Sequence, residues 1–173
     1  MTGSPTAVLR QATGDDLHAV LEVGLRTWPA TYAPIAGKDY VALGLAKWWT
    51  EEATIPAIRA GRVLVTEVDG AVVGMVSFSP QDGHFMIWKL YVLPEFHGQG
   101  LGHRLLTAAI NRAHAEKFAD VRLSYLVGND HAGEFYRRHG FIEYDREHGG
   151  SGMPDSVWIR KPLRDEPQQE EKA

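Results

Sequence analysis

The sequence predicts an α+β fold: a mixed, mostly antiparallel sheet of about six to seven strands with helices on both faces. Short β-branched runs alternate with segments of helical period, and no internal repeat is present. The clearest signal is a hairpin over residues 62–68 and 71–79, because Asp69-Gly70 suits a tight turn with positive φ. We expect one domain over residues 7–163 and a solvated tail over 164–173.

The other elements follow from periodicity and breakers. After a short strand at 7–10, apolar residues repeat at helical spacing as far as Trp28. Pro29 and Pro34 predict that this helix ends there and that residues 29–38 form a loop. A single helix is expected over about 39–59. Beyond the hairpin we expect strands at 85–93, 121–127, 141–145 and 157–160, and helices at 98–117 and 130–139.

Composition excludes several classes of protein. The chain has 173 residues, a net charge of −4 and no cysteine, which removes thiolate metal sites and cysteine nucleophiles. The acidic balance argues against a broad nucleic-acid-binding face. Apolar runs are too short for a membrane helix, and no secretory signal is evident. We therefore expect a cytoplasmic protein with a small partner, no nucleic acid or membrane contact, and no metal.

The first informative motif spans residues 90–102. A strand ends at Pro94, three alternating glycines follow, and a helix begins. Free N–H groups at a helix start bind anions, so the pattern predicts a phosphate cradle; a tight turn without a ligand is the alternative. A dinucleotide fingerprint is excluded because His103 stands where glycine is needed, and no P-loop Gly-Lys pair follows.

The second motif spans residues 129–141. Tyr136 is either a positioned phenol that donates a proton or a half-exposed residue beside Phe135 in the core. Gly140 ends the helix ahead of a strand in both interpretations.

Together the two segments resemble the GNAT superfamily of N-acetyltransferases. The family's acetyl-CoA motif, Arg/Gln-x-x-Gly-x-Gly/Ala after a strand, reads here His97-Gly98-Gln99-Gly100-Leu101-Gly102. Its later motif is matched by Asn129, Phe135-Tyr136 and Gly140-Phe141. The resemblance covers about residues 8–163 and implies a sheet splayed where acetyl-CoA binds, with coenzyme A as product.

The resemblance also implies roles for single residues. The pantetheine arm would pair with the backbone of residues 90–92, and the pyrophosphate would lie on the N–H groups of 98–102. Asn129 would bind the cofactor arm and Tyr136 would protonate the departing thiolate. His97 stands where the family usually has Arg or Gln, so cofactor affinity is expected to depend on pH. The expected cofactor residues are Leu90, Tyr91, Val92, His97, Gly98, Gln99, Gly100, Leu101, Gly102, His103, Asn129 and Tyr136.

Catalytic and acceptor residues are less directly indicated. His84, at the start of the strand, is the candidate general base; a solvated turn histidine and a water chain to Glu22 are the alternatives. A bulge near Leu90 and Tyr91 would supply an oxyanion donor. Trp28 and Tyr32 would line the acceptor pocket, with a core role as the alternative.

The sequence thus predicts an acetyl-CoA-dependent N-acetyltransferase. It would act on a primary amine of a small molecule or peptide by direct attack in a ternary complex. The rival hypothesis is an acyl-CoA-binding sensor with little catalysis. A homodimer is compatible with the sequence.

Overall fold

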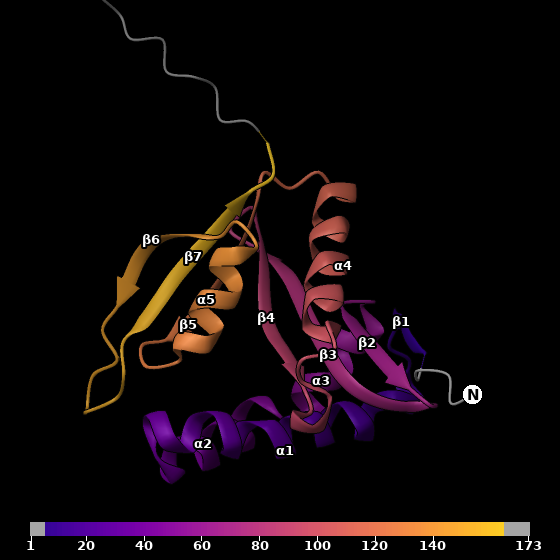
Figure 1. The fold of residues 1–173 in the computed structure, drawn as a ribbon, viewed down its shortest axis with the longest axis horizontal. Helices are drawn as coiled ribbons and strands as arrows, with labels where there is room; N and C mark the ends of the chain where they lie inside the picture. Colours follow the sequence, from indigo (N-terminus) through magenta and orange to yellow (C-terminus); the bar gives the residue numbers. More distant parts are fainter. Residues whose placement is uncertain (1–5, 165–173) are drawn as a thin grey trace, which may run out of the picture.

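A computed structural model describes residues 6–164 as one open, seven-stranded mixed sheet flanked by helices (Figure 1). The strand order is β1-β2-β3-β4-β5-β7-β6. This confirms the predicted α+β class. The strands are β1 (Ala7–Gln11), β2 (Val63–Val68), β3 (Ala71–Gln81), β4 (His84–Val92), β5 (Asp120–Leu126), β6 (Ile142–Glu147) and β7 (Ser156–Pro162).

Five α-helices connect these strands: α1 (Leu17–Ala36), α2 (Lys38–Trp48), α3 (Glu51–Arg59), α4 (Leu101–Ala115) and α5 (Asp130–Arg138). Within residues 6–164, no helix is both long and apolar enough to cross a membrane. Apart from Arg164, the predicted tail lies outside the described residues.

The pairing of β4 with β5 divides the sheet into two halves. Every other neighbouring pair is antiparallel, whereas β4 and β5 run parallel and pair only at Phe85–Val121 and Met86–Arg122. Beyond these two pairs the strands diverge toward the end of β4 (Figure 1). The sheet is therefore splayed, as the family resemblance implied.

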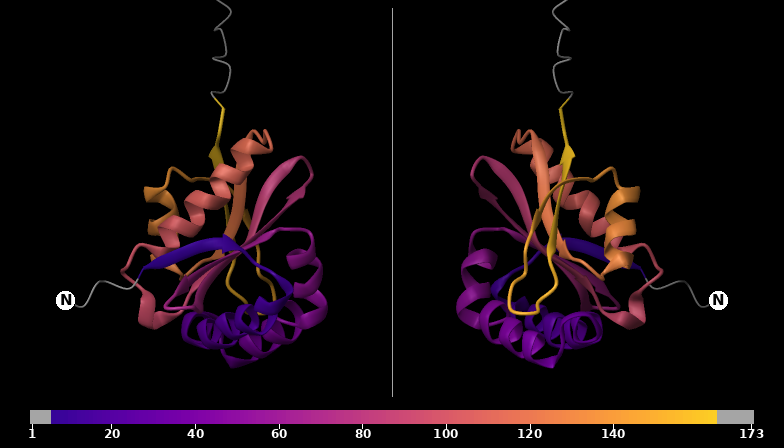
Figure 2. Two further views of the ribbon diagram at one scale, coloured as in Figure 1. Left: turned by 90° about the vertical axis from the view of Figure 1, so that its right-hand side faces the viewer. Right: turned by 90° about the vertical axis from the view of Figure 1, so that its left-hand side faces the viewer.

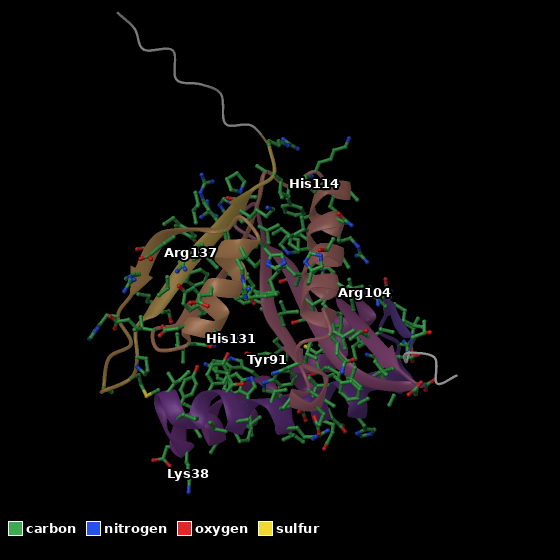
Figure 3. All side chains as sticks on the ribbon, in the orientation of Figure 1. Lys38, Tyr91, Arg104, His114, His131 and Arg137 are labelled. Atoms are coloured by element: carbon green, nitrogen blue, oxygen red, sulfur yellow. The ribbon has the colours of Figure 1, made fainter. Side chains whose placement is uncertain are left out.

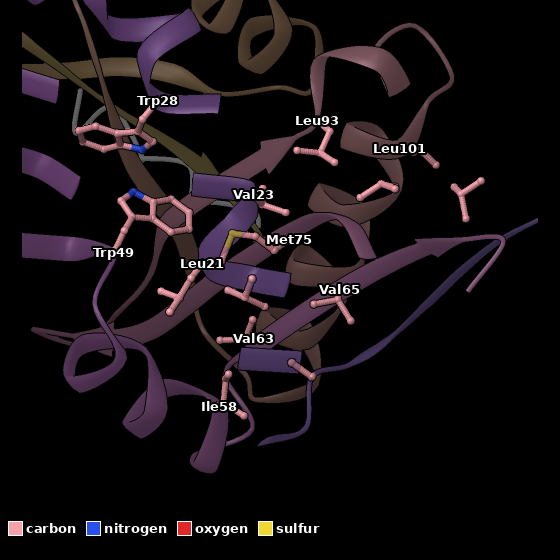
Figure 4. Close-up of a cluster of buried hydrophobic side chains, with 14 of the residues drawn as sticks. Leu21, Val23, Trp28, Trp49, Ile58, Val63, Val65, Met75, Leu93 and Leu101 are labelled. Carbon is pink, nitrogen blue, oxygen red and sulfur yellow. The ribbon is translucent and has the colours of Figure 1, made fainter. Parts of the chain in front are cut away.

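Two apolar clusters hold the helices against opposite faces of the sheet (Figure 2). One joins α1, α2 and α3 to the sheet, with Trp28 and Trp49 at one end and Leu101 at the other (Figure 4). The second joins α4 and α5 to the other face and includes Phe78, Phe85 and Tyr136. Burial on both faces explains the near-continuous apolar runs of β3 and β4.

The predicted end of the first helix at Trp28 is wrong. Helix α1 continues to Ala36 with Pro29 and Pro34 inside it. Each proline removes one N–H from the helix, which frees the carbonyls of Leu25 and Ala30 four residues earlier. All four of these residues lie on the exposed face, where water can satisfy the freed carbonyls. Tyr32 consequently lies on a helix and not in a loop.

The predicted single helix over 39–59 is also wrong, because α2 ends at Trp48 and α3 begins at Glu51. Thr50 caps α3, and its hydroxyl accepts the N–H of Ala53 at 3.2 Å. Trp49 leaves the helical conformation between them, and its buried ring packs on α1.

Two glycines let tryptophan rings lie directly on helix backbones. A Cβ atom at Gly24 would lie 2.1 Å from the Trp49 ring, and one at Gly44 would lie 2.1 Å from the Trp28 ring. These helices therefore approach each other at positions where no side chain larger than hydrogen fits. These contacts fix the positions of Trp28 and Trp49 on the face of the sheet that α1, α2 and α3 cover.

Replacing Gly24 by alanine should destabilise the protein by about 1–3 kcal/mol, because the rigid indole of Trp49 must move. This runs against the gain of about 1 kcal/mol that alanine normally brings to a helix. Gly14→Ala is the matched control, since a Cβ there meets nothing within 4 Å. Urea unfolding measures the free energy of unfolding of both variants. Equal stability of Gly24→Ala and Gly14→Ala would contradict the close contact between Gly24 and Trp49.

Candidate active site

A cleft of about 750 Å³ opens where β4 and β5 separate. Side chains from α1, β4, β5, α5 and the start of α4 line it. Tyr91 of β4 and His131 of α5, which lie near each other in Figure 3, both line it. A cavity at the splay of an open sheet is a usual place for a ligand site.

The glycine motif forms a cradle at one end of this cleft. Gly98 and Gly100 have φ of 78° and 77°, and a Cβ at either would meet nothing within 4 Å. Gly100 is the N-cap of α4, so the N–H groups of the first turn have no acceptor within the helix. A Cβ at Gly102 would make an ordinary contact with the Phe135 ring at 3.7 Å, so packing against α5 does not itself require the third glycine. The open backbone donors fit a pyrophosphate.

The charge of the cleft also suits phosphates. Among its described lining residues are Arg138 and Lys89 but no aspartate or glutamate. Four histidines lie in the same wall: His97, His103, His131 and His139. A cleft lined by one sign of charge concentrates ligands of the opposite sign.

His97 differs from the arginine or glutamine that the motif usually carries. Its Nε2–H donates to the carbonyl of Val92 at 2.7 Å, so only Nδ1 remains for a ligand. The ring can therefore donate to a phosphate only when Nδ1 is also protonated.

Most of the predicted cofactor residues come together in this cleft. Gln99 is exposed and does not line it. Those that do line it are Leu90, Tyr91, Val92, His97, Gly98, Gly100, Leu101, Gly102, His103, Asn129 and Tyr136. The carboxamide oxygen of Asn129 accepts the N–H of Ala132 at 3.4 Å and caps α5. Its NH₂ group donates to no described residue.

Tyr136 lies deeper than the half-exposed position considered for it. It is 8% exposed, between the rings of Phe135 and Phe141 at 5.2 and 5.5 Å. Burial raises the pKa of its phenol, and Tyr32 nearby adds to this effect. The hydroxyl therefore keeps its proton, and no described residue is hydrogen-bonded to it. A protonated phenol that lines the cleft can serve as a proton donor.

A second cavity of about 670 Å³ lies on the same side of the sheet as α1–α3. Trp28 lines it, although its ring also belongs to the core. The Tyr32 and Tyr91 hydroxyls share a 2.8 Å hydrogen bond where the two cavities meet. Six residues line both cavities: Tyr32, Trp88, Lys89, Tyr91, Ser124 and Tyr125. Two ligands could therefore meet at this junction.

The structure does not bring His84 into the site. Its Nδ1 is hydrogen-bonded to Asp120 at 2.7 Å, at the end of β4 that still pairs with β5. It lines neither cavity, and Leu90 lies six residues, or about 20 Å, further along the strand. Glu22 is exposed on α1 and lines neither cavity as well.

The β-bulge also lies elsewhere than expected. Ser77 pairs with Lys89 and Phe78 with Ile87, so Trp88 is the extra residue. The bulge thus precedes Leu90 instead of including it. It leaves the backbone of Trp88 without a partner residue on β3, at the junction of the cavities.

Lys89 is the site residue that the sequence analysis missed. Its Nζ donates to the carbonyl of Trp48 at 2.5 Å and lies 4.2 Å from the centre of the Trp49 ring. Burial lowers its pKa to about 8. Lys89 is the one charged residue in the otherwise apolar run 85–93, and this is the signal in the sequence that could have identified it as a candidate site residue.

Comparisons with known proteins agree with this geometry. Residues 59–143 match the family described as "Acetyltransferase (GNAT) domain". A spermidine N(1)-acetyltransferase of Thermoplasma acidophilum is 22% identical over 145 residues, which cover 80% of this chain and 90% of that protein.

Solved structures share the fold. The PaiA N-acetyltransferase of Thermoplasma acidophilum, in complex with coenzyme A, superposes with a TM-score of 0.81 at 21% identity. That match covers 91% of this chain and 99% of the other. The ribosomal-protein-S18-alanine N-acetyltransferase of Escherichia coli has a TM-score of 0.71 at 17% identity, covering 95% and 98%. The family match thus assigns residues 59–143, which include the glycine cradle at the splay, to the GNAT acetyltransferase domain family, and the solved structures show the same fold over nearly the whole chain.

Proposed function

We propose that this protein is an acetyl-CoA-dependent N-acetyltransferase that acts on a primary amine in a ternary complex. The observation that carries the proposal is the meeting of two cavities at the splay, one of which ends in a phosphate cradle. The acceptor would be a small-molecule or peptide amine. A homodimer and a cytoplasmic location stay predictions from the sequence.

The splay leaves part of β4 ready to bind an extended arm. Only Phe85 and Met86 pair with β5, so further along β4 the edge that faces β5 lacks a strand partner. Such an edge binds the amide groups of an extended ligand as an added strand would. The pantetheine arm would lie along residues 90–92, with the pyrophosphate of the cofactor on the N–H groups of 98–102.

The residues at the junction then divide the chemistry. Bound acetyl-CoA would supply a thioester whose carbonyl carbon forms a C–N bond with the neutral amine as the C–S bond breaks. The proton that the amine nitrogen loses would pass to water in the cleft, and water would return a proton to the Tyr136 phenol after each turnover. Tyr136 holds a proton at its phenol oxygen and donates it to the departing sulfur. Tyr32 and Tyr91 stay neutral because burial raises both pKa values, and their mutual hydrogen bond fixes the wall of the junction.

The alternative function is an acyl-CoA sensor, and an assay separates the two. The protein is mixed with acetyl-CoA and a panel of primary amines, and release of the coenzyme A thiol is followed. Turnover with any amine above the rate of hydrolysis supports the enzyme. Binding of acetyl-CoA without thiol release for any amine supports the sensor.

Acetyl-CoA should stabilise the fold by ~2.7 kcal/mol at a hundred times its dissociation constant. Gly100→Asp should abolish the shift, because it adds bulk and negative charge at the cradle. Gly152→Asp is the matched control: its φ is also 77°, a Cβ there also meets nothing, and it does not line the cleft. An unchanged melting temperature at millimolar acetyl-CoA would refute the cofactor assignment.

Tyr136→Phe should lower turnover by about 10²–10⁴-fold with little change in acetyl-CoA affinity, because the ring stays packed and only the proton donor is lost. Tyr144→Phe should be neutral, since Tyr144 lies on β6 and lines neither cavity. Steady-state kinetics compare the two. A loss below tenfold would reduce Tyr136 to a positioning role.

A further inference from the structure

The charged residues that line the second cavity are all positive. Among the described residues that line it there is no aspartate or glutamate, and the charged ones are Lys89 and Arg62. Arg62 already faces a carboxylate, because its Nη2 lies 4.0 Å from Oε1 of Glu116, the residue that follows α4. No described carboxylate lies within ion-pair distance of Lys89. The cavity therefore contains one half-buried ammonium without a described counter-charge.

Such a group calls for an anion. Burying a charge without a partner is costly, and a carboxylate brought by a ligand would offset that cost. Lys89 uses one donor on the Trp48 carbonyl and keeps the others. Three other buried donors among the residues that line the cavity have no hydrogen-bond partner in the described chain: the Thr54 hydroxyl, Trp28 Nε1 and Arg62 Nη1.

Aromatic rings form part of the remaining wall, together with small and aliphatic residues and four serines. Its rings include Trp28, Tyr40, Trp48 and Tyr125. Aromatic faces also attract cations, but Lys89 already lies over Trp49 and would repel a second positive charge. A polyamine is therefore a poor fit to this cavity.

We propose that the acceptor is an α-amino acid with an apolar side chain, whose carboxylate binds Lys89 at the junction of the two cavities. This rests on the proposed acetyltransferase function and names its substrate class. Lys89 lines both cavities, so a carboxylate bound there keeps the neighbouring amine at the junction. The aromatic cavity takes the side chain. The spermidine named for the relative from Thermoplasma acidophilum lacks this carboxylate.

The test compares acceptors that differ in one group. Phenylalanine carries the carboxylate, 2-phenylethylamine lacks it, and phenylalaninamide replaces it with the amide that a peptide N-terminus would present. Spermidine represents the polyamines. For the wild-type protein, kcat/KM should be at least tenfold higher for phenylalanine than for the other three. Equal or better use of spermidine, phenylalaninamide or 2-phenylethylamine would overturn the proposal.

Variants of Lys89 identify the group that makes the difference. Lys89→Met should remove the preference for phenylalanine, and Lys89→Arg should keep it. Lys47→Met is the control, because Lys47 lies near the Trp48 ring at 5.3 Å but lines neither cavity. If both Lys89 variants lose activity equally toward all acceptors while still binding acetyl-CoA, Lys89 does not act through the carboxylate and the proposal fails.

A binding measurement separates this proposal from the proposed function. Calorimetry with the coenzyme A-loaded protein measures the affinity for phenylalanine and for 2-phenylethylamine. One outcome is that no amine is acetylated, but that the wild type and Lys89→Arg bind phenylalanine at least tenfold more tightly than 2-phenylethylamine. In the same outcome, Lys89→Met binds the two ligands equally. The carboxylate site then stands and the enzyme assignment falls. If phenylalanine does not bind, the carboxylate site is refuted whatever the activity.

Discussion

The short parallel pairing of β4 with β5 is the constraint on which the site depends. Two residue pairs hold the halves of the sheet together, and beyond them the strands separate. The separation leaves an edge of β4 without a strand partner and opens the cleft that α4 and α5 flank. A continuous ladder would satisfy those backbone groups internally and leave no place for an extended ligand. The anion cradle and the junction of the cavities both lie along this opening.

The helices on the other face add a second cavity that meets this opening. Helix α1 runs past two prolines because its affected carbonyls face water, and this carries Tyr32 to Tyr91. The close contacts of Gly24 with Trp49 and of Gly44 with Trp28 press α2 and the α2–α3 connection onto α1. Packing of the core thus shapes the second cavity, because the buried ring of Trp28 also lines it.

Charge distinguishes the two cavities from the rest of the molecule. The chain carries a net charge of −4, yet no described carboxylate lines either cavity. The cofactor phosphates and the carboxylate of the proposed acceptor are both anions, so a site without carboxylates suits the ternary complex that we propose. The relatives named for spermidine and for a ribosomal protein share the fold at low identity, which leaves the acceptor to the local chemistry of this cavity.

Local signals were sufficient for the elements whose chemistry lies within a few residues. Asp69-Gly70 set a hairpin, Gly98, Gly100 and Gly102 set a cradle, and Phe135-Tyr136 placed a phenol on a helix, because turns and helix starts depend on short-range backbone geometry. Long-range packing decided the rest. Whether Pro29 ended α1 depended on which face met water, and whether His84 or Lys89 entered the site depended on where β5 left β4. A strand's sequence gives the alternation of its side chains, but only its neighbours determine which of them face a cavity.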